Sequence, residues 1–262
     1  MTVMKIQLLV SAVDQDAGAL IEQMHISTDA VIVNQCDRYG YEEKIHCGHR
    51  VQVFSMPERG VGLSRNTALL HADTDVCVFT DEDIVLSEDY KEKIRKAYHD
   101  IPDADMILVN VKVAPSRRTY WNEDVHRITY RNYGRYPAYS ITAKYDALLR
   151  ANVHYSLLFG GGAKYSNGED SLFIKDCLKA GLKLYSHTVC IGKEIERKST
   201  WFNGYHEKFF KDRGVLYRYL YGWLALPLSL RFLLAHKDEM CRDISVKQAY
   251  AWMKDGVREA KG

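Results

Sequence analysis

Apolar and polar positions alternate in blocks along the first half of the chain. Five short apolar runs predict buried strands. They occupy residues 5–10, 30–34, 51–54, 76–79 and 106–113. Amphipathic patterns at residues 16–24, at 63–71 and after Ser87 predict helices between them. Ser87 is expected to cap its helix, with Glu88 and Asp89 in the first turn. Strands that alternate with helices predict an α/β fold with a mainly parallel sheet and helices on both faces.

The second half of the chain is less regular. Residues 115–145 are rich in arginine and tyrosine, which fits either an irregular substrate-binding segment or a solvated insertion. A glycine-rich run at residues 159–163 predicts a flexible loop. A helix is expected from Asp170 to Ala180, because Gly181 is a favourable residue just beyond a helix end.

Charge becomes more positive in the last quarter of the chain. From residue 193 onward there are 14 basic and 9 acidic residues, a net charge of +5, whereas the preceding residues carry −3. Residues 215–235 are strongly apolar, but Arg218, Pro227 and Arg231 interrupt them, so a transmembrane span is a poor fit. Two interpretations remain open. One is a helical hairpin around Pro227 that packs on the rest of the chain, and the other is a helix pair in the plane of a membrane.

The composition is that of an ordinary soluble globular protein. The 262 residues are 47% hydrophobic and 27% charged, with a net charge of +2. These values exclude a disordered chain and offer no general electrostatic case for nucleic acid. The first residues lack the pattern of an export signal, and the six cysteines include no Cys-x-x-Cys pair. We therefore expect reduced thiols and a cytoplasmic location.

The sharpest chemical signal is Asp81-Glu82-Asp83, directly after the fourth apolar run. Three adjacent acids repel one another unless they bind a cation or extend into water. Carboxylate oxygens suit Mg²⁺ or Mn²⁺, and these ions in turn suit a diphosphate. A solvated acidic turn is the competing interpretation, and the acidic run taken alone favours it.

A second motif lies upstream, where Gly60 and Gly62 precede a predicted helix. Their spacing matches the start of a dinucleotide-binding fingerprint, but Arg65 holds the third glycine position and no clean strand–turn–helix pattern precedes it. We therefore do not expect a dinucleotide site here. Arg65, near a helix start, can instead face a phosphate.

Several motifs, taken in order along the chain, are typical of one family. They are the segments at residues 59–68, 80–83, 159–163, 168–173 and 199–214. Together they resemble family 2 glycosyltransferases of the GT-A fold, of the type that builds bacterial surface polysaccharides. The resemblance implies a Rossmann-like domain that binds a nucleotide sugar, which we expect at residues 1–205, and a C-terminal helical extension at 206–262.

The resemblance also implies roles at the donor end of the site. Asp81 and Asp83 would hold Mn²⁺ or Mg²⁺, with Asp81 also near the ribose and diphosphate. Arg65 would approach the nucleotide, and Gly161 would lie against the nucleotide sugar. Ser11 and Val13, at the end of the first strand, would line the base.

The base-recognition position departs from the family pattern. The family often has an aspartate there that contacts uracil, whereas this chain has Asn34-Gln35. An amide oxygen, such as that of Gln35, can still accept a hydrogen bond from the uracil N3–H. The resemblance therefore implies a UDP-sugar, with the base less firmly specified.

At the acceptor end, Asp170 would be the catalytic base, and Glu169 would be a second catalytic residue or would instead hold the acceptor. An acid in the first turn of a helix is kept ionised by the helix dipole, although ordinary helix-terminal charge is the competing interpretation. His187 and His206 are weaker candidates for a further metal ligand. Trp201 is a candidate for stacking on a sugar.

The function implied is inverting transfer of a hexose from a nucleotide sugar, with Mg²⁺ or Mn²⁺, to a lipid-linked or oligosaccharide acceptor. The setting would be the cytoplasmic face of the membrane, with possible peripheral membrane contact. Two alternatives stay open: a sugar-nucleotide-binding partner without catalysis, and a sugar nucleotidyltransferase. The presence of both Asp81 and Asp170 argues against the first, and the lack of a glycine-rich loop after the first strand argues against the second.

Overall fold

The computed structural model describes residues 3–195 and 204–260. Within them the chain forms a nine-stranded sheet in the order β3-β4-β2-β1-β5-β8-β7-β9-β6. The strands are β1 (Ile6–Val13), β2 (Asp29–Gln35), β3 (Gly40–His46), β4 (His49–Met56), β5 (Val76–Asp81), β6 (Ile84–Leu86), β7 (Met106–Lys112), β8 (Ile141–Lys144) and β9 (Leu184–Glu194). The α-helices are α1 (Ala17–Gln23), α2 (Val61–Leu70), α3 (Tyr90–Asp100), α4 (Tyr145–Ala151), α5 (Glu169–Lys179), α6 (Glu207–Tyr221), α7 (Ala225–Ala235), α8 (Lys237–Met240) and α9 (Val246–Glu259). Short 3₁₀ helices are η1 (Ala138–Ser140) and η2 (Gly222–Leu224).

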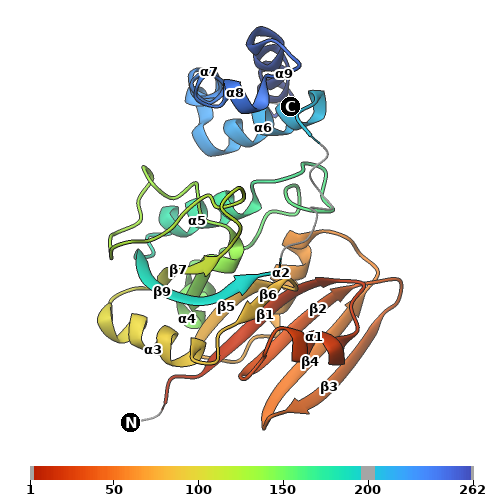
Figure 1. Cartoon of the computed structure of the whole chain (residues 1–262), viewed down its shortest axis with the longest axis vertical. Helices are drawn as coiled ribbons and strands as arrows, with labels where there is room; N and C mark the ends of the chain where they lie inside the picture. The colour runs from red at the N-terminus through yellow and green to blue at the C-terminus, as the bar shows by residue number, and fades with distance from the viewer. Residues whose placement is uncertain (1–2, 196–203, 261–262) are drawn as a thin grey trace.

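The central strands of the sheet are parallel. β1 pairs in parallel with β2 and with β5, β2 pairs in parallel with β4, and β7 pairs in parallel with β9. β3, β6 and β8 run antiparallel to their neighbours. Figure 1 shows this sheet below the C-terminal helices α6 to α9. The predicted α/β fold with a mainly parallel sheet is therefore confirmed.

Each central strand buries both of its faces. Leu8, Val10 and Ile32 belong to one core, which α1 and α3 cover. Leu9 and Val33 belong to the other core, which α2, α4 and α5 cover. This burial on two sides explains why β1, β2 and β5 read as nearly continuous apolar runs rather than as alternating patterns.

Helix α3 begins later than the sequence suggests. Asp89 is its N-cap residue and Tyr90 its first residue, so the expectation that Ser87 caps it is wrong. The backbone N–H of Ser87 instead donates to the carbonyl of Ile191 on β9, at 2.8 Å. This bond continues the pairing of β6 with β9, which places Ser87 beside the sheet before the helix starts.

The sequence patterns missed four strands, β3, β6, β8 and β9. β3 is an exposed edge strand that carries polar residues in succession, so it shows no alternation. β6 and β8 have only three and four residues. The strand expected at residues 51–54 is present as β4, and a strand–turn–helix unit does surround Gly60, contrary to the sequence pattern, because β4 ends at Met56 and α2 begins at Val61.

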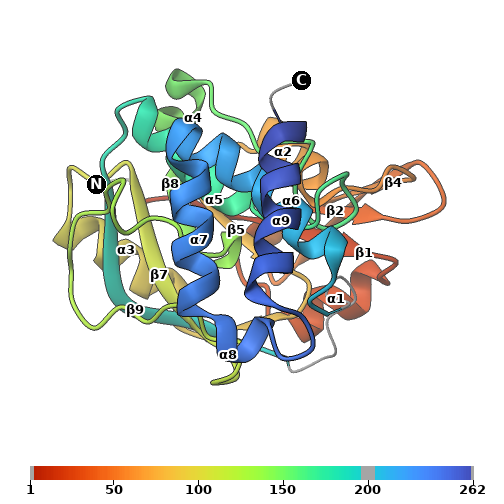
Figure 2. The ribbon, with the colours of Figure 1, turned by 90° about the horizontal axis from the view of Figure 1, so that it is seen from above.

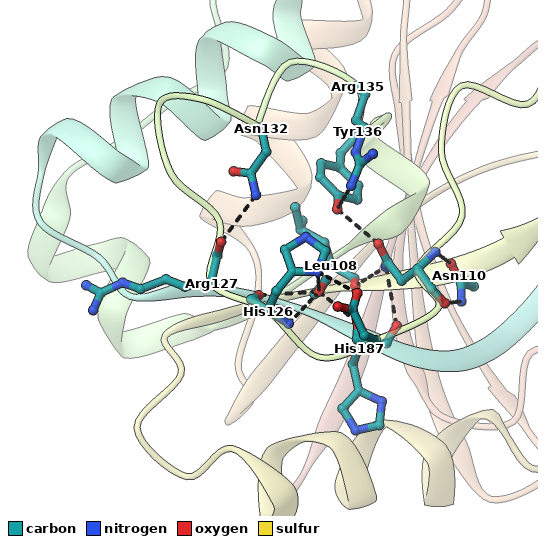
Figure 3. A network of polar contacts seen from close by, with 11 residues as sticks. Leu108, Asn110, His126, Arg127, Asn132, Arg135, Tyr136 and His187 are labelled. Carbon is teal, nitrogen blue, oxygen red and sulfur yellow. Dashed lines mark hydrogen bonds and ion pairs between the residues drawn. The ribbon is translucent and has the colours of Figure 1, made fainter.

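The arginine- and tyrosine-rich segment is irregular but anchored to the sheet. Figure 3 shows Asn110 of β7 in a cluster of polar contacts with this segment. Asn110 Oδ1 accepts from the backbone N–H of Asn122 at 2.8 Å, and Asn122 Nδ2 donates to the Leu108 carbonyl at 2.8 Å. The Tyr136 hydroxyl donates to Asn122 Oδ1 at 2.9 Å. Because a buried polar group left unpaired costs about 1–3 kcal/mol, these bonds hold the segment in place, and it is not a freely solvated insertion.

The C-terminal helices pack against one another. Figure 2 looks down on α6, α7 and α9, which lie across the top of the molecule. A Cβ atom on Gly214 of α6 or Gly256 of α9 would lie only 2.0 Å from a backbone oxygen of the other helix, so both glycines permit close approach. The turn between α6 and α7 lies at residues 222–224, so the expected hairpin is not centred on Pro227. Pro227 lies in the first turn of α7, where a residue without an N–H is tolerated.

The structure also bears on membrane crossing. Across residues 3–195 and 204–260, no helix is both long enough and apolar enough to span a bilayer.

Candidate active site

The carboxyl ends of β1, β2 and β5 meet at one edge of the sheet, where ligands bind in open α/β folds. A cavity of about 600 Å³ opens there. It is lined by Ser11, Val13, Gln15, Gln35, Val61, Arg65, Asp81, Glu82, Asp83, Arg117, Pro137, Tyr139, Gly161, Glu169, Asp170 and Glu194. All nine residues assigned to the site from the sequence are among them, although they come from distant parts of the chain.

The middle residue of the acidic run has a different structural role from its neighbours. Glu82 accepts a hydrogen bond from the backbone N–H of Val13 at 2.6 Å. Its own backbone N–H donates to the Ser11 carbonyl at 3.2 Å. Glu82 therefore joins the end of β5 to the end of β1. Asp81 and Asp83, on either side of it, supply further carboxylates to the same cavity.

Arg65, on α2, connects the two acidic groups that the sequence places 89 residues apart. One terminal nitrogen lies 3.0 Å from Asp81 Oδ1. The other lies 3.0 Å from Glu169 Oε1 and 2.8 Å from Asp170 Oδ1. The Arg65 side chain is only 4% exposed and also lies over the ring of Tyr155. Its charge is thus engaged by three carboxylates, an arrangement that the sequence did not indicate.

The buried charges change one another's proton affinity. Burial alone would lower the pKa of Arg65, but Asp81, Asp170 and Glu169 together raise it well above its ordinary value. Burial and then the charge of Glu169 raise the pKa of Asp170 well above the usual range, while Arg65 opposes this rise. Because about a fifth of the Asp170 side chain remains exposed, the carboxylate stays accessible from the cavity. Asp170 therefore combines access with an increased affinity for a proton.

The glycine-rich run at residues 159–163 is packed tightly, in contrast to the flexible loop expected from the sequence. The backbone N–H of Val61 donates to the Gly161 carbonyl at 2.9 Å, which fixes the loop to the start of α2. Gly160 has φ +103, and a Cβ atom there would lie 2.5 Å from Val61 and 2.8 Å from Glu169. The glycines therefore permit the loop to press against both helices that carry the charged groups.

The side chain of Gln35 has a structural partner. Its Oε1 accepts from the backbone N–H of Gly60 at 2.7 Å. The neighbouring Asn34 Oδ1 accepts from the backbone N–H of Gln15 at 3.0 Å, and its Nδ2 donates back to the Gln15 carbonyl. Each amide oxygen therefore already accepts one hydrogen bond from the backbone. Because an amide oxygen has a second lone pair, acceptance from a base N–H stays a prediction.

Two charged residues of the cavity escaped the sequence analysis as site residues. Arg117 forms an ion pair with Glu194 at 2.8 Å, and both residues line the cavity. Arg117 belongs to the arginine-rich segment, so its residue type was a signal, but its partner lies 77 positions away. Glu194 ends β9, a strand that the sequence patterns did not predict.

The weaker candidates lie elsewhere. His187 is buried and contacts Asp100 at 3.2 Å, and it does not line the cavity. In Figure 3 its ring points away from the polar cluster toward a helix. His206 is the N-cap residue of α6, where its ring accepts from the backbone N–H of Phe209. Trp201 lies outside the described residues.

The donor set of the cavity fits a divalent cation. The described residues contain no cluster of three or more His, Cys, Asp or Glu side chains that could hold a metal by themselves. Mg²⁺ sites that also bind phosphates, however, use only one or two protein carboxylates. Asp81 and Asp83 supply that number, and the carboxylates near Arg65 outnumber its single positive charge. An anionic diphosphate would approach such a cavity more readily together with a cation.

Comparisons with known proteins agree with this geometry. Residues 17–155 match the model of the family described as Glycosyl transferase family 2. No curated protein matches the chain in sequence.

Several solved structures share the fold. TarS residues 1–349 of S. aureus in complex with UDP-GlcNAc superpose with a TM-score of 0.60 and 14% identity, over 92% of this chain and 74% of TarS 1–349. The same TarS fragment in complex with UDP gives a TM-score of 0.59 and 15% identity, over 98% of this chain and 82% of the fragment. The match to a longer TarS structure covers 94% of this chain but only 46% of that structure, with a TM-score of 0.60. At these identities the similarity establishes a shared fold.

Proposed function

Because the chain belongs to glycosyl transferase family 2, we propose that its cavity transfers a hexose from a UDP-sugar to an acceptor hydroxyl with inversion at the anomeric carbon. One observation carries this proposal. The Arg65 guanidinium lies within 3.0 Å of Asp81 and of both Glu169 and Asp170, so the donor and acceptor ends of the site adjoin. The UDP and UDP-GlcNAc complexes of TarS, which has the same fold, support the donor class.

Asp83 and Asp81 would hold Mg²⁺ or Mn²⁺ beside the donor diphosphate. A bound divalent ion supplies neutralisation of the charge that develops on the departing diphosphate. Arg65 keeps the ionised Asp81 side chain oriented, since an ion pair at 3.0 Å limits the rotation of the Asp81 carboxylate. Ser11, Val13 and Gly161 form the wall against which the nucleotide sugar would lie.

Asp170 is the proposed general base. An acceptor hydroxyl gives its proton to the Asp170 carboxylate as its oxygen bonds to the anomeric carbon. The bond between that carbon and the diphosphate oxygen breaks, and the electron pair leaves with UDP. A raised pKa suits this role, because a base works best when its pKa lies near the working pH. Glu169, 3.0 Å from Arg65, would orient the acceptor or Arg65 itself.

Arg65 has a different proposed role from the one the resemblance implies. Its terminal nitrogens are already engaged by carboxylates, so it would act by orienting acids rather than by holding the nucleotide. We assign it as a positioning residue between the metal-binding and base ends of the site.

The acceptor and the location complete the proposal. The acceptor would be a lipid-linked or oligosaccharide glycan of a bacterial surface polysaccharide, and the chain would work at the cytoplasmic face of the membrane in peripheral contact with it. The resemblance of the sequence motifs supports this setting. We also propose that residues 1–205 form the catalytic domain and residues 206–262 a helical extension.

The test measures donor binding and turnover separately. UDP with Mn²⁺ should raise the melting temperature of the native chain, and GDP or dTDP should do so less, because a ligand that binds only the folded state stabilises it. UDP release from UDP-hexoses should require a divalent cation and stop with EDTA.

Asp83→Asn should remove the metal-dependent part of both signals. Asp89→Asn, an exposed acid at the start of α3, is the matched control and should change neither. Full UDP release by Asp83→Asn, or by the native chain in EDTA, would refute the metal assignment.

A further inference from the structure

Helix α7 presents an apolar stripe to solvent. Trp223, directly before the helix, is 82% exposed, and Leu230 and Leu234 are 40% and 55% exposed. Together with the exposed Pro227, these residues recur every three or four positions and so lie along one side of the helix. The opposite side, with the buried Ala225 and Leu233, already packs against the neighbouring helices. A surface helix normally has polar residues on its outer side. Helix α7 differs, because apolar residues lie on its exposed side as well as on its buried side. We call the four exposed residues the α7 ridge.

Several cations without ion pairs lie on α7, close to it in the chain or in the groove beside it. No acidic residue occurs between Asp212 and Asp238, whereas this stretch contains Arg218, Arg231 and Lys237. Arg131, from the arginine-rich segment, lines the same groove as Arg231. Within the described ranges, no ion pair engages the side chain of Arg131, Arg218, Arg231 or Lys237. These charges are therefore available to an external anion.

The groove beside the α7 ridge is both aromatic and basic. It has a volume of about 610 Å³, and its lining combines Arg131 and Arg231 with Tyr130, Tyr217 and Tyr221. None of the described residues that line it carries a carboxylate. Tyrosine and tryptophan favour the boundary between water and lipid, because their rings are apolar and carry one polar atom. Arginine favours phosphate, which it can contact through two parallel hydrogen bonds.

We propose that the α7 ridge and its groove dock the chain on an anionic lipid bilayer. The ridge enters the interface with α7 parallel to the surface, and Arg131 and Arg231 contact headgroup phosphates. A helix of 11 residues is about 16 Å long, which suits a helix that lies in the interface rather than one that crosses it. The proposal rests on the proposed function only in giving the docked enzyme a lipid-linked acceptor.

Charge complementarity favours a bilayer over a second copy of the chain. A second α7 ridge would bring another set of unpaired arginines against the first, and like charges in an interface repel. An anionic lipid surface supplies the opposite charge to every cation around the ridge at once.

Flotation with vesicles tests the proposal on the whole chain. The native chain should float with vesicles of phosphatidylglycerol and phosphatidylethanolamine at low salt, and much less with phosphatidylcholine vesicles. Arg131→Gln with Arg231→Gln should weaken binding to the anionic vesicles about 25-fold, at about fivefold per charge. Arg38→Gln with Lys44→Gln removes the same charge from the region of β3 and should have little effect.

A second pair of variants tests the apolar contact. Trp223→Gln, Leu230→Gln and Leu234→Gln combined should weaken vesicle binding at least about tenfold, because they convert the ridge to a polar surface. Ile45→Gln with Leu70→Gln is the matched control, since these side chains are 71% and 77% exposed elsewhere on the molecule. The melting-temperature shift with UDP and Mn²⁺ should be the same in every variant, which separates docking from donor binding.

Three outcomes would overturn the docking proposal. The first is that the native chain fails to float with anionic vesicles. The second is that the control pairs reduce binding as much as the ridge and groove variants do. Alternatively, the native chain is a dimer that the ridge variant converts to a monomer, without vesicle binding by either. Flotation that persists while UDP and Mn²⁺ cause no shift would instead refute the proposed function and leave the docking surface standing.

Discussion

The arginines of the cavity and those beside the α7 ridge differ in burial and in pairing with carboxylates. In the cavity, Arg65 is almost fully buried and contacts three carboxylates within 3.0 Å. Beside the ridge, Arg131 and Arg231 line an open groove, and no acidic residue in the described part of the chain lines it. A buried charge must be paired within the fold, since the cost of removing it from water is otherwise too high. An exposed charge can stay unpaired until a partner arrives, so one region is organised in advance and the other is available for recruitment.

A third arginine sharpens this comparison. Arg213 of α6 is half-buried, and its guanidinium lies against the rings of Phe209 and Phe232. No carboxylate of the described residues forms an ion pair with it, and its Nε has no hydrogen-bond partner there. Burial lowers its pKa. Arg65 and Arg213 therefore differ mainly in whether acids surround the buried guanidinium.

The largest expected effect is on turnover. Asp170→Asn should lower the rate of sugar transfer about 10²- to 10⁴-fold, because it removes the general base while it keeps the shape of the side chain. Binding of UDP with Mn²⁺ should persist. Asp176→Asn, on the same helix but outside the cavity, is the control. Transfer by Asp170→Asn at the native rate would exclude Asp170 as the base.

The next largest effect is on stability. Arg65→Met should lower the free energy of unfolding by about 3–5 kcal/mol, because it leaves three carboxylates close together without their cation. Arg213→Met should cost less than about 1 kcal/mol, since it replaces a cation that has no acidic partner with an apolar side chain of similar length. Urea unfolding of both variants measures the difference. Equal losses would show that acid pairing is not what holds Arg65.

A smaller loss of stability is expected where the cavity adjoins the C-terminal helices. Gly168, the N-cap residue of α5, has φ +109, and a Cβ atom there would lie 2.4 Å from Leu216 of α6. Gly168→Ala should destabilise the fold by about 2–3 kcal/mol, since it combines backbone strain with overpacking. Gly181→Ala has φ +85 and open space around it, so it should cost only about 1 kcal/mol. Thermal unfolding of the two variants should separate the cost of backbone strain from the cost of overpacking. Equal melting temperatures would contradict the packing explanation.

The smallest effect concerns pH. The pKa of Asp170 is higher in the folded chain than its ordinary value of 3.8, so the folded state binds more protons than the unfolded state between these two values. Stability contributed by this group is therefore present at low pH and declines as pH rises through the folded pKa. Asp170→Asn should consequently stabilise the chain at neutral pH, and the gain should shrink as pH falls toward the ordinary pKa of the group. Melting curves across this range measure it, and a gain that grew toward acid would reverse the sign of the proposed shift.

Much of the site could be predicted from local sequence. Asp81, Asp83 and Asp170 stand in motifs where the residue types, their order and the neighbouring strand or helix signal all agree. Glu82, in contrast, could not be distinguished from its neighbours, because only its contact with Val13 on a distant strand gives it a different role. The hydrogen bond of the Gln35 amide could not be foreseen for the same reason, since its partner Gly60 lies on another segment.

The sequence by itself determined the parallel core and nine of the residues that line the cavity. Strands that are buried on both faces need continuous apolar runs, which are visible in the sequence. The acids of the site directly follow such a run in the chain, so they could be identified in the same way. Only the tertiary structure decided how those residues pair. Arg65 meets Glu169 across 104 positions, and the α7 ridge is recognisable only once the buried side of that helix is known. Periodicity reports which residues can share a face over a few turns or strands, whereas charge pairing and exposure depend on which distant segments pack together.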